Sequence, residues 1–183
     1  MDAAAYLTIT REHFAAIRRK ADRALAQADD AKFFATLDPE SNSLALLVKH
    51  VAGNLRSRWT DFLTADGEKP DRARDAEFVA DAANDTRAAL DRRWNEGWAA
   101  LFGALDAMRP EDLDRVVTIR GEPLSAFAAI ERQKEHYAYH VGQIVFLSKH
   151  LAGKAWRPQS IPKGGSAAYD AESRAKWAAG GPG

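Results

Sequence analysis

Two histidines, His136 and His140, stand four residues apart in a segment whose apolar residues recur with helical periodicity. On a helix, positions i and i+4 lie on one face, with Cβ atoms about 6 Å apart. Two imidazoles at that spacing can close on one divalent ion. The spacing alone leaves two interpretations open, a metal site or two core histidines satisfied by hydrogen bonds, because two ligands do not complete a site. Tyr137 occupies the position of the glutamate in the His-Glu-x-x-His motif of zinc proteases, which disfavours such a protease.

The segment around these histidines predicts a helix with two neighbouring faces. Its apolar stripe is typical of a core-facing helix and comprises Phe127, Ile130, Tyr137, Val141, Ile144 and Leu151. The histidines lie on an adjacent line of positions, 133, 136, 140 and 143, that points into the same interior. Such a line of polar residues needs a partner on a facing helix.

A third histidine, His50, lies beside the apolar stripe of an earlier helical segment, and Asn54 follows one turn later on the same edge. Taken alone, His50 could be a buried, hydrogen-bonded histidine or a metal ligand, and the pattern does not separate the two. With a histidine pair elsewhere in the chain, it becomes the natural third ligand. His13 has no second ligand-type residue one turn away, which favours a partly buried structural histidine.

The composition excludes several classes of function. The 183-residue chain has 26 basic and 26 acidic residues, a formal net charge of zero and no cysteine. The charge balance argues against nucleic acid as the main partner, because phosphate binding usually leaves a basic excess. Without cysteine there is no disulfide, no thiolate ligand and no cysteine nucleophile. We find no signal peptide and no apolar run near the roughly 18 residues of a membrane span, so we expect a soluble, cytoplasmic protein.

Amphipathic segments predict an all-α protein, a four-helix bundle around one core. We expect helices over 3–28, from the cap candidates at 41–43 to about 63, over 81–108 and over 123–151. The polar connection at 64–80 is longer than usual helix–helix loops, which argues against simple up-down-up-down connectivity. Its charges are interpreted as solvated surface. A bundle interior is a common place for a metal held by facing helices.

The remaining segments before residue 165 are interpreted as connections and helix ends. Residues 33–39 predict a loop whose apolar residues pack against the bundle: Phe33, Phe34 and Leu37. Val116–Ile119 is the single strand-like run. Pro123 suits the first turn of the last helix, and Gly153 suits the position after its end.

The chain shows no internal repeat and no boundary between domains. We expect one bundle domain over residues 1–165. An extended C-terminal tail follows over 166–183, which is partly disordered or holds a short helix near 172–178.

Two stretches together resemble the DinB/YfiT-like superfamily. The first is Leu47-Val-Lys-His-Val-Ala-Gly-Asn-Leu-Arg-Ser-Arg-Trp-Thr-Asp-Phe62, and the second is His136-Tyr-Ala-Tyr-His-Val-Gly-Gln-Ile144. The resemblance covers roughly residues 5–165 and is closest to a branch of unknown function. It implies a four-helix bundle with one long crossover, frequently a homodimer. It also implies a divalent metal, zinc or nickel, held by His50, His136 and His140, all of which this sequence retains.

The chemistry of such a site follows from its ligands. Three neutral imidazoles leave at least one coordination position open, where a metal lowers the pKa of a bound water or stabilises a thiolate. Four residues are candidates for orienting the imidazoles or binding a ligand: Asn54, Gln133, Tyr137 and Gln143. The alternative for each is an ordinary buried polar contact between helices.

The resemblance implies a metal-dependent enzyme acting on a small molecule, and two reactions are open. Characterised members of the superfamily include transferases that use a low-molecular-weight thiol, and a chain without cysteine would take its nucleophile from that thiol. Other members are described as hydrolases, but the motif offers no clear general base, since Glu135 points about 100° away from His136 on a helix. Two further alternatives are a non-catalytic, stress-associated metal-binding dimer and histidines that merely pack in the core.

Overall fold

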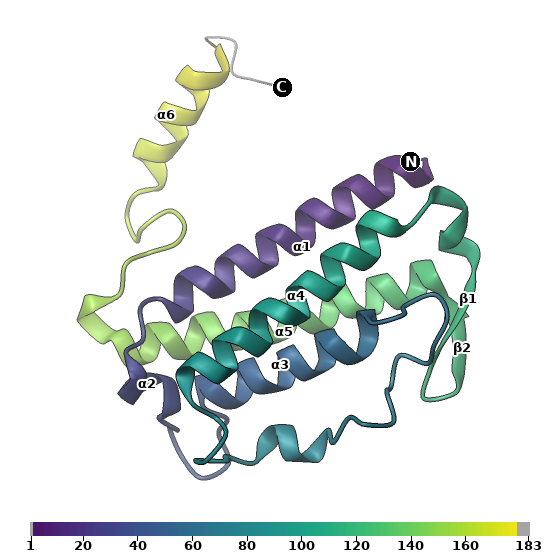
Figure 1. The fold of residues 1–183 in the computed structure, drawn as a ribbon. Coiled ribbons are helices and arrows are strands. Elements are labelled where there is room, and N and C mark those ends of the chain that lie inside the picture. The colour runs from purple at the N-terminus through teal and green to yellow at the C-terminus, as the bar shows by residue number, and fades with distance from the viewer. Residues whose placement is uncertain (1, 179–183) are drawn as a thin grey trace.

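The computed structural model describes residues 2–178, which are helical apart from connections and one small hairpin. Its long helices lie alongside one another in a bundle (Figure 1). They are α1 (Ala3–Leu25), α3 (Leu44–Trp59), α4 (Arg87–Ala107) and α5 (Ala126–Ala152). The shorter α2 (Asp30–Phe34) and α6 (Ser166–Ala178) complete the α-helices of the described residues. The predicted all-α fold is confirmed.

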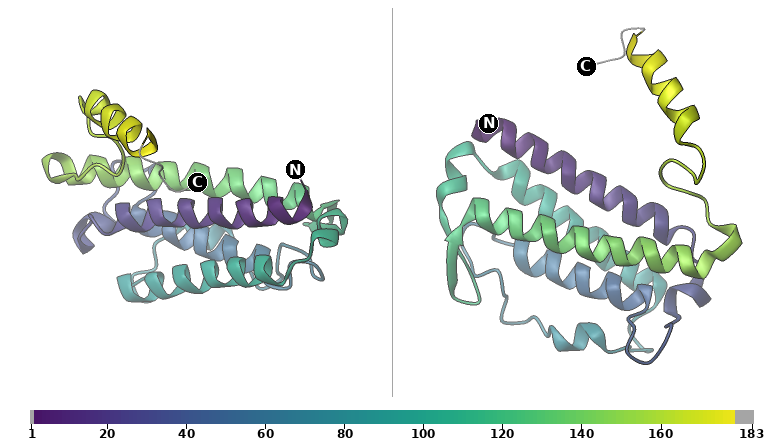
Figure 2. Two further views of the ribbon diagram at one scale, coloured as in Figure 1. Left: turned by 90° about the horizontal axis from the view of Figure 1, so that it is seen from above. Right: turned by 180° about the vertical axis from the view of Figure 1, so that it is seen from behind.

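The connection between α3 and α4 crosses the length of the bundle. Figures 1 and 2 show α3 and α4 running in the same direction, while α1 and α5 run the opposite way. Residues 60–86 therefore return the chain from the end of α3 to the start of α4, and they include the 3-10 helix η1 (Asp75–Phe78). Neighbouring helices that run in parallel cannot be joined by a short loop, so this connection is the long crossover that the resemblance implies.

Side-chain caps fix where the long helices begin. In each case a side-chain oxygen accepts a hydrogen bond from the backbone N–H three residues later, and the capping residues are Asp2, Ser43, Thr86 and Ser125. The caps place the start of α4 at Arg87 and of α5 at Ala126, later than the predicted starts at 81 and 123. At the other end of α5, Gly153 has a φ of 54°, a left-handed conformation that favours glycine.

A hairpin precedes α5. Strand β1 (Val116–Ile119) pairs antiparallel with β2 (Glu122–Ser125), so the strand-like run is confirmed and gains a partner. Pro123 lies in β2 opposite Thr118, and the prediction that it starts the helix is wrong. A strand at a sheet edge accommodates proline because its missing N–H costs no ladder bond there. The turn between the strands is Arg120-Gly121, with φ values of 56° and 76°, as two-residue hairpins require.

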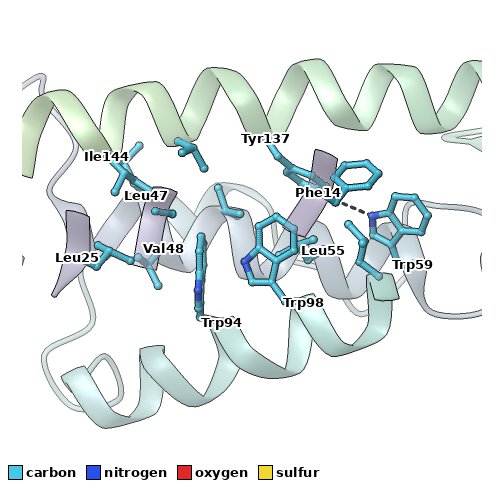
Figure 3. Close-up of a cluster of buried hydrophobic side chains, with 14 of the residues drawn as sticks. Phe14, Leu25, Leu47, Val48, Leu55, Trp59, Trp94, Trp98, Tyr137 and Ile144 are labelled. Atoms are coloured by element: carbon cyan, nitrogen blue, oxygen red, sulfur yellow. Dashed lines mark hydrogen bonds between the residues drawn. The ribbon is translucent and has the colours of Figure 1, made fainter. Parts of the chain in front are cut away.

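Aromatic side chains fill the centre of the core (Figure 3). Trp59, Trp98 and Tyr137 are fully or almost fully buried between α3, α4 and α5, and Phe14 of α1 packs edge-on against Trp59. The buried face of α1 includes Thr10 and Phe14, and position 13 points about 100° away from position 14 on the helix. The prediction that His13 is partly buried is therefore wrong, because it is exposed.

The segment after α1 packs less completely than predicted. Residues 30–34 form α2, which overlaps the beginning of the loop expected over 33–39. Phe33 is fully buried and lies under the guanidinium of Arg87, 4.1 Å from its ring centre. Phe34 and Leu37 are exposed, so only one of the three predicted apolar anchors is confirmed. On a helix, Phe33 and Phe34 point about 100° apart, and only one of them can face the core.

Replacement of Gly97 with alanine is expected to destabilise the protein, because α3 and α4 touch there. An added Cβ would lie 2.9 Å from Cβ of Leu55 and 3.1 Å from the carbonyl oxygen of Ala52. We expect a net loss of about 1–3 kcal/mol in the free energy of unfolding. Gly103 of the same helix has no neighbour within 4 Å of an added Cβ, so its replacement with alanine should stabilise by about 0.5–1 kcal/mol. Urea unfolding of both variants tests this contrast, and equal effects would contradict it.

The C-terminal segment stands apart from the bundle. Helix α6 projects away beyond the end of α5 (Figures 1 and 2) and has no buried residue. It begins at Ser166, earlier than the short helix predicted near 172, while residues 179–183 of the predicted tail lie outside the described residues. The division into a domain over 1–165 and a tail stays a prediction. Among the described helices, none combines the length and the apolar character that crossing a membrane requires.

Candidate metal centre

Three histidines from two facing helices meet in the bundle. His50 belongs to α3, and His136 and His140 lie one turn apart on α5. His50 and His140 are buried and His136 is half-buried. Their candidate ligand atoms all lie within 4.8 Å of one another. The structure therefore brings together all three residues that the sequence singled out.

The spacing of the three rings fits one small cation. Nε2 of His136 lies 3.4 Å from Nε2 of His50 and 3.2 Å from Nε2 of His140. Nitrogen ligands at about 2.0–2.1 Å from a tetrahedral zinc ion are about 3.3–3.4 Å apart. The two Nε2–Nε2 separations are therefore close to the separation of nitrogen ligands around a tetrahedral zinc ion.

Hydrogen bonds at Nδ1 fix the orientation of two of the imidazole rings, those of His50 and His140. Nδ1 of His50 lies 2.8 Å from Oε2 of Glu77, and Nδ1 of His140 lies 3.0 Å from Oε1 of Gln143. Both oxygens are acceptors, so each Nδ1 carries the proton and each Nε2 is left with its lone pair. A histidine that donates through one nitrogen to a carboxylate or carbonyl and faces a metal with the other is a recurring arrangement in metal sites.

Burial favours the neutral form of His136 and His140, which is the form that binds metals. Burial, together with the neighbouring His140 and His50, lowers the pKa of His136 to about 3. Burial and then His50 lower the pKa of His140 as well. His136 can donate one Nε2 proton to only one of its two neighbours, so at least one buried lone pair has no donor in the protein. A cation satisfies all three nitrogens at once, whereas hydrogen bonds among the imidazoles cannot.

Of the four residues predicted to support the site, only Gln143 bonds to an imidazole. Tyr137 and Asn54 bond to each other instead, with the phenol of Tyr137 donating to Oδ1 of Asn54 at 2.9 Å. The same phenol accepts from Nε1 of Trp59 at 3.0 Å (Figure 3), and burial raises its pKa. Gln133 is buried, and its Oε1 has no partner among the described residues. Any role of these residues towards a ligand stays a prediction.

Sequence reasoning missed the carboxylate that holds His50. Glu77 lies in η1, is buried, and receives two hydrogen bonds of 2.8 Å from the buried guanidinium of Arg72. Burial by itself would raise the pKa of Glu77, but the hydrogen bonds from Arg72 and His50 outweigh it, so the pKa is lowered. The charges of the connection at 64–80 were interpreted as solvated surface, and that is wrong for Arg72 and Glu77. No periodic pattern in the sequence predicts that Arg72 and Glu77 pair with each other and reach His50.

A pocket of about 390 Å³ opens beside the imidazoles. All three histidines line it, with Asn54 and Gln133 next to them. The rest of its lining is basic or aromatic: Arg58, Arg72, Arg74, Phe78, Arg120, Arg132 and Tyr139. The volume is within the range of small-molecule sites, about 300–1,000 Å³.

Replacement of Gly53 with alanine is expected to weaken the site without unfolding the protein. Gly53 lies on α3, and an added Cβ would collide with the carboxylate of Glu77. Displacing Glu77 removes the hydrogen bond at Nδ1 of His50, a kind of contact whose loss lowers metal affinity about 10–100-fold. Gly142 of α5 has free space around an added Cβ, so its alanine variant is the control. Chelator-competition titration compares the two, and equal zinc affinity would contradict the role of this contact.

Asp66 is expected to stabilise the hairpin in a pH-dependent way. Its carboxylate accepts backbone hydrogen bonds of 2.7–2.8 Å from Glu68, Arg120 and Gly121, and these lower its pKa. A carboxylate whose folded pKa lies below its unfolded value stabilises the protein above about pH 3.9, and this contribution is lost as the pH falls further.

We therefore expect Asp66→Asn to lower the free energy of unfolding by about 1 kcal/mol at pH 7 and by less below pH 4. Urea unfolding at several pH values measures this, with the exposed Asp114→Asn as control. A difference from the wild type that grows on acidification would contradict the assignment.

Comparison with protein families identifies one match over most of the chain. Residues 2–165 match the family described as protein of unknown function DUF1572, which covers every residue of the three-histidine cluster and its pocket. A comparison with curated proteins finds no match. The chain belongs to the DUF1572 family of proteins of unknown function.

Proposed function

We propose that this protein is a metal-dependent enzyme in which His50, His136 and His140 hold one divalent ion, zinc or nickel. The observation that carries the proposal is the convergence of three histidine nitrogens within 4.8 Å of one another, with Nε2 of His136 at 3.4 Å and 3.2 Å from Nε2 of His50 and His140. Two of the rings are held by acceptors at Nδ1. The resemblance of the two histidine-bearing stretches to the DinB/YfiT-like superfamily supports the same ligand set.

An ion with three protein ligands keeps a position for a further ligand and lowers the pKa of a water or thiol that binds there. The residues of this chain then have separate tasks. Glu77 and Gln143 hold the imidazoles of His50 and His140 in orientation, and the buried ring of Tyr137 packs against that of His136. The adjoining pocket admits the small molecule.

The residues around the pocket favour a thiol transferase over a hydrolase. No Asp or Glu is among the pocket-lining residues of the described chain, so the activation of water has no carboxylate as general base. Glu135 is exposed, as its place on the helix predicts. The chain has no cysteine, so a nucleophilic sulfur must come from a low-molecular-weight thiol, whose thiolate the ion would stabilise.

The non-catalytic alternative is a metal-binding dimer in which the ion only stabilises the fold. That alternative predicts no ligand pocket beside the ion. The pocket of about 390 Å³ that the three histidines line therefore supports an enzyme over a purely structural site.

The homodimer itself stays a prediction, and α5 offers a surface for it, since Tyr139 and Phe146 are both exposed. Sedimentation analysis of the wild type and Phe146→Glu tests that surface.

The experiment that tests the proposal is elemental analysis of protein purified without an affinity tag, before and after reconstitution with zinc or nickel. We expect a stoichiometric divalent ion in the wild type and none in His50→Ala. The loaded protein should then consume an electrophile only when a low-molecular-weight thiol is supplied. Absence of metal even after reconstitution would refute the site. Stoichiometric metal with no turnover across thiols and hydrolysable esters would favour the non-catalytic alternative.

A further inference from the structure

Five arginines surround the mouth and wall of the histidine pocket. They come from four separate parts of the chain: Arg58 from α3, Arg72 and Arg74 from the long connection, Arg120 from the hairpin turn, and Arg132 from α5. No carboxylate lines the pocket within the described chain. A chain with zero net charge therefore concentrates positive charge at this one place.

Three of the arginines, the buried Arg58 and Arg72 and the half-exposed Arg120, share one carboxylate. Glu68 lies 2.8 Å from Arg58, 3.2 Å from Arg72 and 3.4 Å from Arg120. Glu77 adds a second carboxylate next to Arg72. Three guanidinium groups thus face two carboxylates, so one positive charge of this network is uncompensated. The side chain of Arg58 is buried, and its Nε has no hydrogen-bond partner among the described residues.

The other two arginines, Arg74 and Arg132, are about half exposed and pair only with exposed carboxylates. Arg132 pairs with Glu122 at 3.0 Å and Arg74 with Asp75 at 3.3 Å, but both carboxylates are well exposed. Ion pairs of this kind are worth little, since water and salt screen them. Arg74 also lies over the ring of Phe78, 5.1 Å from its centre, and Phe78 packs on the ring of His50. Arg74, Phe78 and His50 therefore form a continuous series of contacts from the rim of the pocket to the imidazoles.

We propose that this pocket binds a small organic anion, with its acid group held by Arg120 and Arg132 and the rest of the molecule extending to the histidines. A guanidinium presents paired N–H donors that match the oxygens of a carboxylate or phosphate, and both side chains are about half exposed at the pocket. The direction of the reacting end towards the histidines depends on the proposed function. Anion binding itself does not, because the arginines are present without the ion.

The test is isothermal titration calorimetry of the whole protein, first stripped of metal and dialysed, then loaded with zinc. The probes are succinate and inorganic phosphate, with succinamide as the neutral analogue of succinate. We expect both anions to bind the metal-free protein, more weakly as salt is raised, and succinamide not to bind. In Arg120→Gln/Arg132→Gln, the affinity should fall about tenfold for each arginine lost. Arg92→Gln, which removes one exposed arginine of α4 outside the pocket, should bind as the wild type.

The possible outcomes test anion binding by the pocket independently of the proposed metal-dependent function. Anion binding by metal-free protein that is weakened only in the pocket variant supports the inference, even if no metal is ever found. No binding of either anion in both forms, equal binding of succinamide, or an unchanged affinity in the pocket variant would overturn it. Elemental analysis of the same samples shows whether the arginine variant still takes up zinc, and so identifies a failure of the metal site independently.

Discussion

Replacement of His140 with alanine is expected to abolish the zinc-dependent stabilisation that the proposed metal site predicts. A ligand that binds only the folded state at 1,000 times its dissociation constant adds about 4 kcal/mol to the free energy of unfolding. For a chain of this size that is a rise in melting temperature of roughly 8–16 °C. His140 supplies the Nε2 atom that lies 3.2 Å from that of His136. Without it only two imidazoles remain, too few for the site. Thermal unfolding with and without zinc measures the loss.

The matched control for this variant is His150→Ala. His150 lies on the same helix but is exposed, so its loss should leave the zinc-dependent rise in melting temperature unchanged. A rise in His140→Ala as large as in the wild type would show that zinc binds elsewhere. If neither protein responded to zinc or nickel, the histidines would be core residues and the metal hypothesis would fail.

Replacement of Glu77 with glutamine should affect metal binding and stability together. The carboxylate holds Nδ1 of His50 and pairs with the buried Arg72. Loss of its charge should lower zinc affinity about 10–100-fold. It also leaves Arg72 with only Glu68, at 3.2 Å, and breaking a buried pair costs about 3–5 kcal/mol. Because Glu68 remains, we expect the lower end, about 3 kcal/mol. Chelator competition and urea unfolding measure the two effects.

Glu135→Gln is the control for this second variant. Glu135 is the neighbour of His136 in sequence but is exposed, so its replacement should change neither quantity appreciably. A Glu77→Gln protein that is less stable yet binds zinc as tightly as the wild type would make Glu77 a partner of Arg72 alone. Circular dichroism at the temperature of the titration verifies that the variant is folded while its affinity is measured.

The ligand cluster could be predicted from the sequence because its geometry is local to helices. The four-residue spacing of His136 and His140 fixes them on one face, and the apolar stripe beside them directs that face inwards. His50 stands in the same relation to the stripe of α3, so two core-facing helices bring the three together. The fold class followed from the same periodicity.

The remaining parts of the site depend on contacts that no periodicity describes. Glu77 and Arg72 meet His50 because the long connection folds back against α3, and their sequence neighbourhood is as polar as any exposed loop. The positive pocket forms only when α3, the connection, the hairpin and α5 converge. On α1, neighbouring positions differ in burial: the ring of Phe14 is fully buried, as the transfer of a large apolar side chain out of water favours, whereas His13 is exposed.

The long connection between α3 and α4 also bears on how this protein can evolve. Surface loops of helical bundles usually tolerate insertions and deletions. Here the backbone carbonyl of Gly67 accepts from Ser57 at 2.8 Å, Ser57 accepts from the backbone of Lys69 at 3.0 Å, and Glu77 reaches His50 only ten residues after Gly67. A length change between Gly67 and Glu77 would shift the carboxylate away from the imidazole. Length variation among relatives should therefore concentrate at residues 79–86, after η1, where the chain is no longer tied to the histidines.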